Sequence, residues 1–223
     1  MTSTAHVPTH KAFALKSFRL TPRRIFELGG IIASVVLLTF GIVSIVMGTN
    51  GTSTVSSSLK AEHIVGTPDM TPAAITAGAR KAGLNISQLA IPSTSVANLP
   101  INSGDRARVM VQYMRIHTLE ATGGFTYAQM GRYEAKPNTP TSQLAVGKGT
   151  DNPAYAVVDP KTKQPVENGA RSIWPTETAL TMALNTSYMA ERLSYFGMMI
   201  GVALLLAGIG FSVLTIGGAL RRK

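Results

Sequence analysis

The sequence predicts a mainly α-helical membrane protein, in which two transmembrane helices flank a mostly helical extracytoplasmic domain that carries a long irregular excursion. Three observations predict this class: two long apolar segments toward the ends of the chain, basic residues beside both, and helical periodicity between them. The composition agrees, because 45% of the 223 residues are hydrophobic and only 14% are charged.

Residues 1–24 are predicted to form a basic cytoplasmic tail. Its basic residues are Lys11, Lys16, Arg19, Arg23 and Arg24. The stretch Phe13–Leu20 could form an amphipathic turn on the inner leaflet, and a disordered tail is the alternative. Basic flanks stay in the cytoplasm, so we expect a multi-pass protein of the bacterial cell (plasma) membrane with both termini inside and the central domain outside.

The first predicted span covers residues 25–47, "IFELGGIIASVVLLTFGIVSIVM", which exceeds the roughly 20 helical residues that cross a bilayer. A cleaved signal peptide is the alternative. Its apolar core would be shorter, and no A-x-A-like cleavage site follows. We therefore expect an uncleaved anchor.

The second predicted span covers residues 193–220 and contains no charged residue. Residues 221–223, two arginines and a lysine, form the predicted cytoplasmic end. A buried core helix of a soluble protein is the alternative, but such helices are usually shorter.

The extracytoplasmic domain is predicted over residues 48–192. It opens with a flexible linker, Gly48–Ser58, rich in glycine, serine and threonine. A helix follows, with Asp69 or Thr71 as its cap and Gly83 as its stop. A second helix is predicted from about Asp105 to Ala121.

Residues 136–172 form a Pro-rich excursion, either functional or mobile, with a short strand at "AYAVVD" and a turn at "DPKTKQP". From Thr176 a further helix, with a capping-box start, is predicted to continue without interruption into the second span.

The most conspicuous polar segment is "HTLEATGGFTY", from His117 to Tyr127. Met110, Tyr113, Met114, His117 and Ala121 share one face of the predicted helix, and Gly123 and Gly124 end it. His117 then lies in the last turn, where a helix dipole favours an imidazolium. A copper site formed by Met110, Met114 and His117 is the alternative to an ordinary core face.

Small residues recur at four-residue spacing in both predicted spans, a pattern that allows close helix packing in lipid. The predicted packing residues are Gly29, Gly30, Ala33, Ser34, Gly197, Gly201, Ala203 and Ala207. Their partner could be the other span of this chain or another protein.

Chemical signatures are few. The sequence has no cysteine, which excludes disulfides and thiolate metal sites and favours a bacterial envelope protein. Only His63 and His117 are predicted outside the membrane, and the common hydrolase and nucleotide motifs are missing. The formal charge of +10 lies largely in the two termini, so it predicts topology and contact with anionic lipid, not nucleic-acid binding. We expect no enzyme activity and no cofactor.

The His117 segment resembles one found in small actinobacterial two-span membrane proteins with an external helical region. The matching positions are His117, Leu119, Glu120, Ala121, Thr122, Gly123, Gly124, Thr126, Tyr127 and Ala128, with Asn185 and Ser187 later. The resemblance covers about half of the chain, and residues 136–172 would be an insertion. The function of these proteins is unassigned, and they are often mislabelled as aromatic ring-opening dioxygenases. That chemistry needs two histidines and a carboxylate around open iron positions, so we do not transfer the label to this chain.

The sequence therefore predicts a non-catalytic accessory or structural subunit of a larger bacterial envelope or respiratory membrane complex. Its partners would be the lipid bilayer and other membrane subunits, as a hetero- or homo-oligomer. The alternative function is an extracytoplasmic ligand-binding or sensing module that uses residues 136–172.

Overall fold

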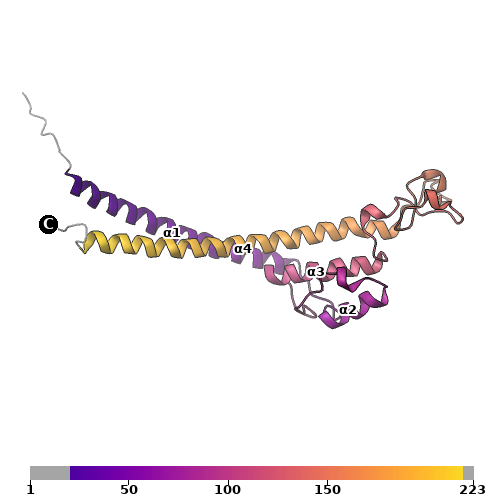
Figure 1. Ribbon diagram of the computed structural model, residues 1–223, viewed down its shortest axis with the longest axis horizontal. Coiled ribbons are helices and arrows are strands. Elements are labelled where there is room, and N and C mark those ends of the chain that lie inside the picture. The colour runs from indigo at the N-terminus through magenta and orange to yellow at the C-terminus, as the bar shows by residue number, and fades with distance from the viewer. Residues whose placement is uncertain (1–20, 218–223) are drawn as a thin grey trace, which may run out of the picture. The chain divides into compact units, whose positions relative to one another are not determined.

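The computed structural model describes residues 21–217, and the chain is mainly helical (Figure 1). The α-helices are α1 (Pro22–Ala61), α2 (Pro72–Lys81), α3 (Gly104–Ala121) and α4 (Gly169–Ile216). Four single 3₁₀ turns lie between them: η1 (Ile86–Gln88), η2 (Tyr127–Gln129), η3 (Thr141–Gln143) and η4 (Pro153–Tyr155). Residues 21–217 contain isolated β-bridges but no β-strand. The predictions for residues 1–20 and 218–223 lie outside the described residues.

The chain divides into two compact units. The described part of unit 1 consists of residues 21–42 and 201–217, and unit 2 consists of residues 43–200. Helices α1 and α4 each contribute residues to both units.

Helices α1 and α4 are long and apolar enough to cross a membrane. In the most apolar 18-residue window of each helix, only 17% of the residues are buried, whereas the core helix of a soluble protein is mostly buried. Large apolar side chains such as Phe40, 61% exposed, and Val213, 63% exposed, face outward. The two long apolar helices are therefore those expected of a two-pass membrane protein.

The flexible linker predicted over Gly48–Ser58 is wrong, because these residues continue α1 as far as Ala61. Glycine, serine and threonine are weak helix formers, so the helix here depends on packing. Gly48 and Gly51 lie against side chains of α4, and Leu59 is buried in the core of unit 2. Tertiary contacts thus override the local composition.

Helices α2 and α3 confirm the two predicted helices. The Thr71 hydroxyl caps α2 by accepting a hydrogen bond from the amide of Ala74, and Gly83 follows with a positive φ of 74°. The Ser103 hydroxyl caps α3 in the same way through the amide of Arg106.

The core of unit 2 lies around α3. Tyr113 is fully buried, and its hydroxyl donates a hydrogen bond of 3.0 Å to the Thr94 carbonyl oxygen. Burial raises the pKa of this phenol above its ordinary value. The other buried apolar residues of this core are Leu59, Met70, Ile75, Ala79, Val96, Ile101, Ala107, Met110, Val111, Ile116 and Leu184. Each large side chain contributes about 1.5–3 kcal/mol by its burial.

Up to Asn168, the excursion predicted over residues 136–172 contains only the 3₁₀ turns η3 and η4 and isolated β-bridges, but it is extensively hydrogen-bonded. The short strand predicted at "AYAVVD" is therefore wrong. Tyr133 pairs with Thr150 through both backbone bonds, each 2.9 Å long. The predicted turn is confirmed, since the Asp159 carboxylate accepts the amides of Lys161 and Thr162. These two amide donors lower the pKa of the Asp159 carboxyl group.

The predicted start of the last helix at Thr176 is wrong, because α4 begins at Gly169. The cap is Asn168, whose backbone carbonyl accepts the Ser172 amide at 3.1 Å and whose side chain accepts the Arg171 amide. Pro175 lies inside the helix at the cost of one backbone hydrogen bond. The predicted continuity into the second span is confirmed, since α4 runs unbroken to Ile216.

Candidate functional site

In unit 1, α1 and α4 pair through small residues. The Ser34 hydroxyl donates a hydrogen bond of 3.1 Å to the Gly208 carbonyl oxygen and also contacts the Ser212 hydroxyl. A Cβ atom added at Gly41 would lie 2.9 Å from the Gly201 carbonyl oxygen. The helices are antiparallel, because partner numbers on α4 fall as those on α1 rise.

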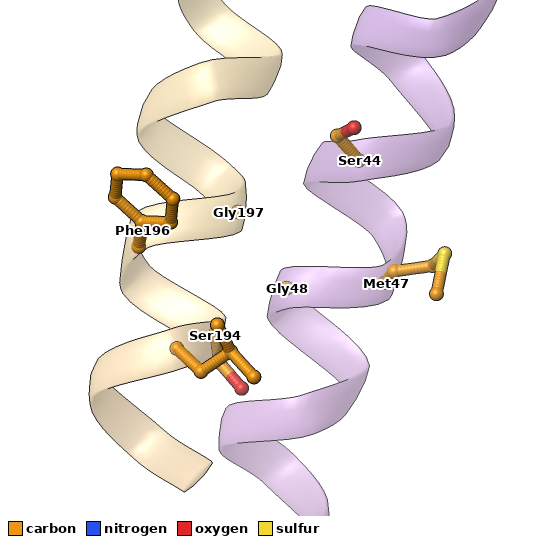
Figure 2. Close-up of a pocket in the computed structure, with 7 residues that line it drawn as sticks. Ser44, Met47, Gly48, Ser194, Phe196 and Gly197 are labelled. Atoms are coloured by element: carbon orange, nitrogen blue, oxygen red, sulfur yellow. The ribbon is translucent and has the colours of Figure 1, made fainter. Parts of the chain in front are cut away.

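In unit 2 the same two helices border a groove of about 310 Å³ (Figure 2). Gly48 and Gly197 face each other across it, while Met47 and Phe196 point away on opposite sides. A Cβ atom at Gly48 would collide with Met198, whereas one at Gly197 would have a single neighbour, the Ser44 carbonyl oxygen at 3.9 Å. Gly48 is therefore required for close packing, and Gly197 leaves space.

The buried small residues of α1 and of α4 each follow a seven-residue repeat. Ser34, Gly41 and Gly48 lie seven residues apart on α1, and Gly201, Gly208 and Thr215 do so on α4. All six residues are buried. A seven-residue repeat keeps one side of a helix facing its partner and is typical of left-handed pairing.

The predicted packing residues lie on different faces. Gly30, Ser34 and Gly201 are buried, and Ala33 and Gly197 are partly buried. Gly29, Ala203 and Ala207 are exposed, and a Cβ atom at Gly29 would meet nothing within 4 Å. Four-residue spacing alone did not identify Gly41, Gly48 and Gly208, which the seven-residue repeat would have found.

His117 lies between two carboxylates. Its Nδ1 atom is 2.9 Å from Oε2 of Glu120 on α3, and its Nε2 atom is 3.5 Å from Oδ2 of Asp69, just before α2. The Asp69 carboxylate also accepts a hydrogen bond from the Thr67 hydroxyl. That hydrogen bond, and secondly the charge on His117, lower the pKa of the Asp69 carboxyl group.

Glu120 packs closely against α2. Its Oε1 atom is buried without a hydrogen-bond partner, and a Cβ atom at Gly78 would lie only 2.7 Å from it. Glu120 is 20% exposed as a side chain and His117 is 31% exposed. The contacts of His117 and Glu120 link α3 to α2 and to the residues just before it. A neutral His117 imidazole can donate a hydrogen bond to only one of its two carboxylate neighbours.

The rest of the family-like segment ends α3 and contacts α4. Gly123 and Gly124 have positive φ angles of 66° and 87°, and the Gly124 amide bonds to the Leu119 carbonyl oxygen at 2.7 Å. Tyr127 lies beneath the Arg171 guanidinium, 3.7 Å from ring centre to Cζ. The predicted helix stop is thus confirmed.

A second groove, of about 440 Å³, lies between α3 and α4. His117 and Met114 line it from α3, and Ile173, Glu177 and Leu180 line it from α4. Glu177 is buried, and its carboxylate lies 3.9 Å from the Arg115 guanidinium. That guanidinium also stacks on Trp174 at 4.2 Å. The groove combines apolar walls with one buried carboxylate.

The residues considered for copper do not all share this groove. Met110 belongs to the buried core, whereas Met114 and His117 line the groove. In residues 21–217, no three His, Cys, Asp or Glu side chains are grouped so that they could hold a metal ion.

A charged cluster joins α3 to α4 just ahead of the second predicted span. Arg192 forms an ion pair with Asp105, which raises the pKa of the guanidinium, and it stacks on Tyr188 at 5.1 Å. A Cβ atom at Gly104 would lie 2.8 Å from Oε2 of the buried Glu191. Glu191 therefore lies at the amino terminus of α3, where a negative charge is favoured.

No model of a known protein family matches the chain, and neither a curated protein nor a solved structure is similar to it.

Proposed function

We propose that the chain is a non-catalytic integral membrane protein and an accessory or structural subunit of a larger bacterial envelope or respiratory membrane complex. Its two spans lie in the cell membrane, both termini are cytoplasmic, and residues 48–192 are outside. The observation that carries this proposal is the surface of α4 ahead of its predicted span, which exposes large apolar side chains and is nearly free of charge.

The apolar character of this surface is unusual for a helix in water. Met182 and Met189 are each 64% exposed and Leu180 is 45% exposed. Between Arg171 and Glu191 the only charged residue is Glu177, which is buried. A water-facing helix normally carries charged residues on its outer face, and exposed apolar side chains that gather on one helix are typical of interaction sites.

The continuation of α1 past its predicted span supports the same function. Residues 48–59 contain no charged residue, and their exposed side chains are small. The hydroxyls of Thr49, Thr52 and Thr54 donate to carbonyl oxygens three or four residues earlier in their own helix. Such a surface, with small uncharged side chains, lets another protein approach closely.

The test is affinity purification of the tagged protein from its native membrane in a mild detergent, with mass spectrometry of the proteins recovered. We expect a stoichiometric set of membrane proteins. Met182→Glu and Met189→Glu should each lower their recovery by about tenfold, equivalent to about 1.4 kcal/mol. Val146→Glu is the control, because Val146 is 81% exposed on another surface. A chain that purifies alone, as a monomer or homodimer, contradicts the proposal.

A second candidate function, ligand binding outside the membrane, is favoured by the groove between α3 and α4. An apolar cavity with few polar groups is the usual form of a small-molecule site. Its buried carboxylate, Glu177, points to a ligand with an apolar body and an amino group. A panel of small apolar amines should raise the melting temperature of the wild-type protein but not that of Leu180→Arg, in which the groove is filled.

A further inference from the structure

A cavity of about 300 Å³ lies in unit 2, beside the start of α4. Unlike the two grooves described above, it is lined mainly by polar and charged side chains, among them Arg132, Glu167 and Arg171. Its volume is at the lower end of the range for small-molecule sites, about 300–1,000 Å³. Two guanidinium groups and one carboxylate therefore share a space large enough for a small polar molecule.

The charged groups of this cavity are not paired with one another. Among residues 21–217, the Glu167 carboxylate forms no ion pair with Arg132 or Arg171, although all three line the same cavity. Neither guanidinium has another acidic partner in this part of the chain. A guanidinium presents five N–H donors in a planar fork that matches a carboxylate. The cavity therefore offers two cationic groups and one anionic group to a ligand.

The side chain of Arg171 is held in place by Tyr127. Its Cζ atom lies 3.7 Å from the centre of the Tyr127 ring, and its Nε atom donates a hydrogen bond of 3.4 Å to the Tyr127 carbonyl oxygen. Within residues 21–217, its two terminal nitrogens donate to no other group. Stacking covers the face of the guanidinium but leaves its edge open, so these two nitrogens can bind a carboxylate side by side.

The backbone of Arg132 is held against Asn168, the residue that caps α4. The Asn168 amide donates to the Arg132 carbonyl oxygen at 2.9 Å, and the Asn168 side chain donates to the Gly131 carbonyl oxygen at 3.0 Å. The Arg132 amide in turn donates to the Asp151 carboxylate at 2.9 Å. Asn168 is buried, so its hydrogen bonds are shielded from water. These bonds bring Arg132 to the same cavity as Arg171, although the two are far apart in the sequence.

The cavity also offers two acceptors for a positively charged group. One is the exposed Glu167 carboxylate. The other is the Arg171 carbonyl oxygen, because Pro175 has no N–H with which to donate the helical hydrogen bond to it. Arg171 and Pro175 both line the cavity. An ammonium group has three N–H donors and no acceptor, so it is suited to two such oxygens.

A lipid headgroup does not reach this cavity in the proposed topology. Arg171 precedes Leu193, the predicted membrane boundary, by 22 residues (193 − 171), which is about 33 Å along a helix axis. The polar layer of one leaflet is only about 5–8 Å thick. A ligand of this cavity is therefore a soluble molecule.

We propose that the cavity binds a free acidic α-amino acid. Arg132 and Arg171 each bind one of its two carboxylates, and Glu167 and the Arg171 carbonyl oxygen accept hydrogen bonds from its ammonium group. Such a ligand places an opposite charge beside each of the three charged groups of the cavity. A simple dicarboxylate or a phosphate would instead leave Glu167 facing a like charge, which disfavours its binding.

Isothermal titration calorimetry of the full chain, purified in a mild detergent, tests the inference. We expect L-glutamate or L-aspartate to bind with a Kd below about 1 mM. Arg132→Gln and Arg171→Gln should each weaken this binding at least about tenfold, because each removes one charge-assisted contact to a carboxylate. Arg80→Gln is the matched control and should bind as the wild type does, because Arg80 is exposed on α2 and does not line the cavity.

Glu167→Gln separates an amino acid from a simple anion. It should weaken the binding of L-glutamate, whose ammonium group loses its charged partner. It should strengthen the binding of glutarate, which is glutamate without the amino group, because a like charge is removed. Melting temperatures show whether the variants are folded. The exposed Arg132 side chain makes no hydrogen bond within residues 21–217, so we expect at least Arg132→Gln to keep the wild-type melting temperature.

The inference is overturned if neither amino acid binds at about 10 mM, or if both arginine variants bind as tightly as the wild type. If Glu167→Gln strengthens the binding of L-glutamate and glutarate alike, the cavity takes simple anions and the assignment to an amino acid is wrong. The purified chain binds or fails to bind these ligands whether or not it is a subunit of a larger complex. Failure here therefore leaves the co-purification test of the proposed function unaffected.

Discussion

The backbone of Gly41 on α1 lies directly against that of Gly201 on α4. A Cβ atom at Gly41 would lie 2.9 Å from the Gly201 carbonyl oxygen and 2.8 Å from Cγ of Leu205. Real Cβ atoms are almost never found so close to a neighbouring backbone, so any larger residue at this position must push the helices of unit 1 apart.

Gly41→Val should therefore destabilise the pairing of the two helices by about 1–3 kcal/mol through overpacking. The measurement is the free energy of unfolding in detergent, obtained by steric trapping of the two helix ends. Gly29→Val is the matched control, because a Cβ atom at Gly29 has no neighbour within 4 Å. Equal effects of the two substitutions would mean that Gly41 is not at the pairing surface.

Ser34→Ala removes the hydroxyl that joins the two helices through the Gly208 carbonyl and the Ser212 hydroxyl. Hydrogen bonds between membrane helices contribute about 0.6 kcal/mol on average, so we expect a loss of that order. The double variant Ser34→Ala/Ser212→Ala should lose little more, because the two hydroxyls act on each other. Strictly additive losses in this double-mutant cycle would contradict the coupling.

Gly104→Ala tests the junction between α3 and α4. The new methyl group would lie 2.8 Å from the Tyr188 Cα atom and 2.8 Å from the Glu191 carboxylate. We expect a loss of about 1–3 kcal/mol, measured by thermal unfolding monitored through Trp174 fluorescence. Gly169→Ala, in open space at the start of α4, should be neutral or slightly stabilising. A neutral Gly104→Ala would show that the two helices are not in contact there.

The lowered pKa of Asp69 predicts that the folded protein loses stability at acid pH. The Thr67 hydrogen bond holds this pKa below the ordinary value, so the stabilisation is present above the unfolded pKa of about 3.9 and is lost as the pH falls through the lower folded value. Thr67→Val removes the hydrogen bond that is the main cause of the lowered Asp69 pKa. The melting temperature of this variant should fall less than that of wild type between neutral pH and about pH 3. If the melting temperatures of the two proteins fell by the same amount, the Thr67 hydrogen bond would not be the cause of the acid sensitivity.

His117→Gln tests the role of the family-like segment. The side chain is partly exposed and contacts two carboxylates, so its replacement should leave the fold intact and change the free energy of unfolding by less than about 1 kcal/mol. The matched control is His63→Asn, at an exposed position with a positive φ of 52° that asparagine tolerates. Loss of a biological activity in His117→Gln, with the melting temperature unchanged, would show that His117 acts on a ligand.

Several elements could be predicted from the sequence because their causes are local. Thr71 and Pro72 begin α2, Gly123 and Gly124 end α3, and the uncharged stretch after Arg192 identifies a helix apolar enough to cross a membrane. Each of these depends on a cap, a backbone conformation or a hydropathy that a few neighbouring residues determine. The face that holds Tyr113 and Met110 was likewise evident from its helical spacing.

By itself, then, the sequence determined two long apolar helices, the two short helices between them and the turns that end them. Only the tertiary structure decided that Gly48–Ser58 is helical, because weak helix formers depend on α4 for their stability. It also decided which small residues meet, such as Gly41 and Gly201, and which carboxylates meet His117. These relationships join residues far apart in the chain, and their energies depend on packing and charge that no local pattern contains.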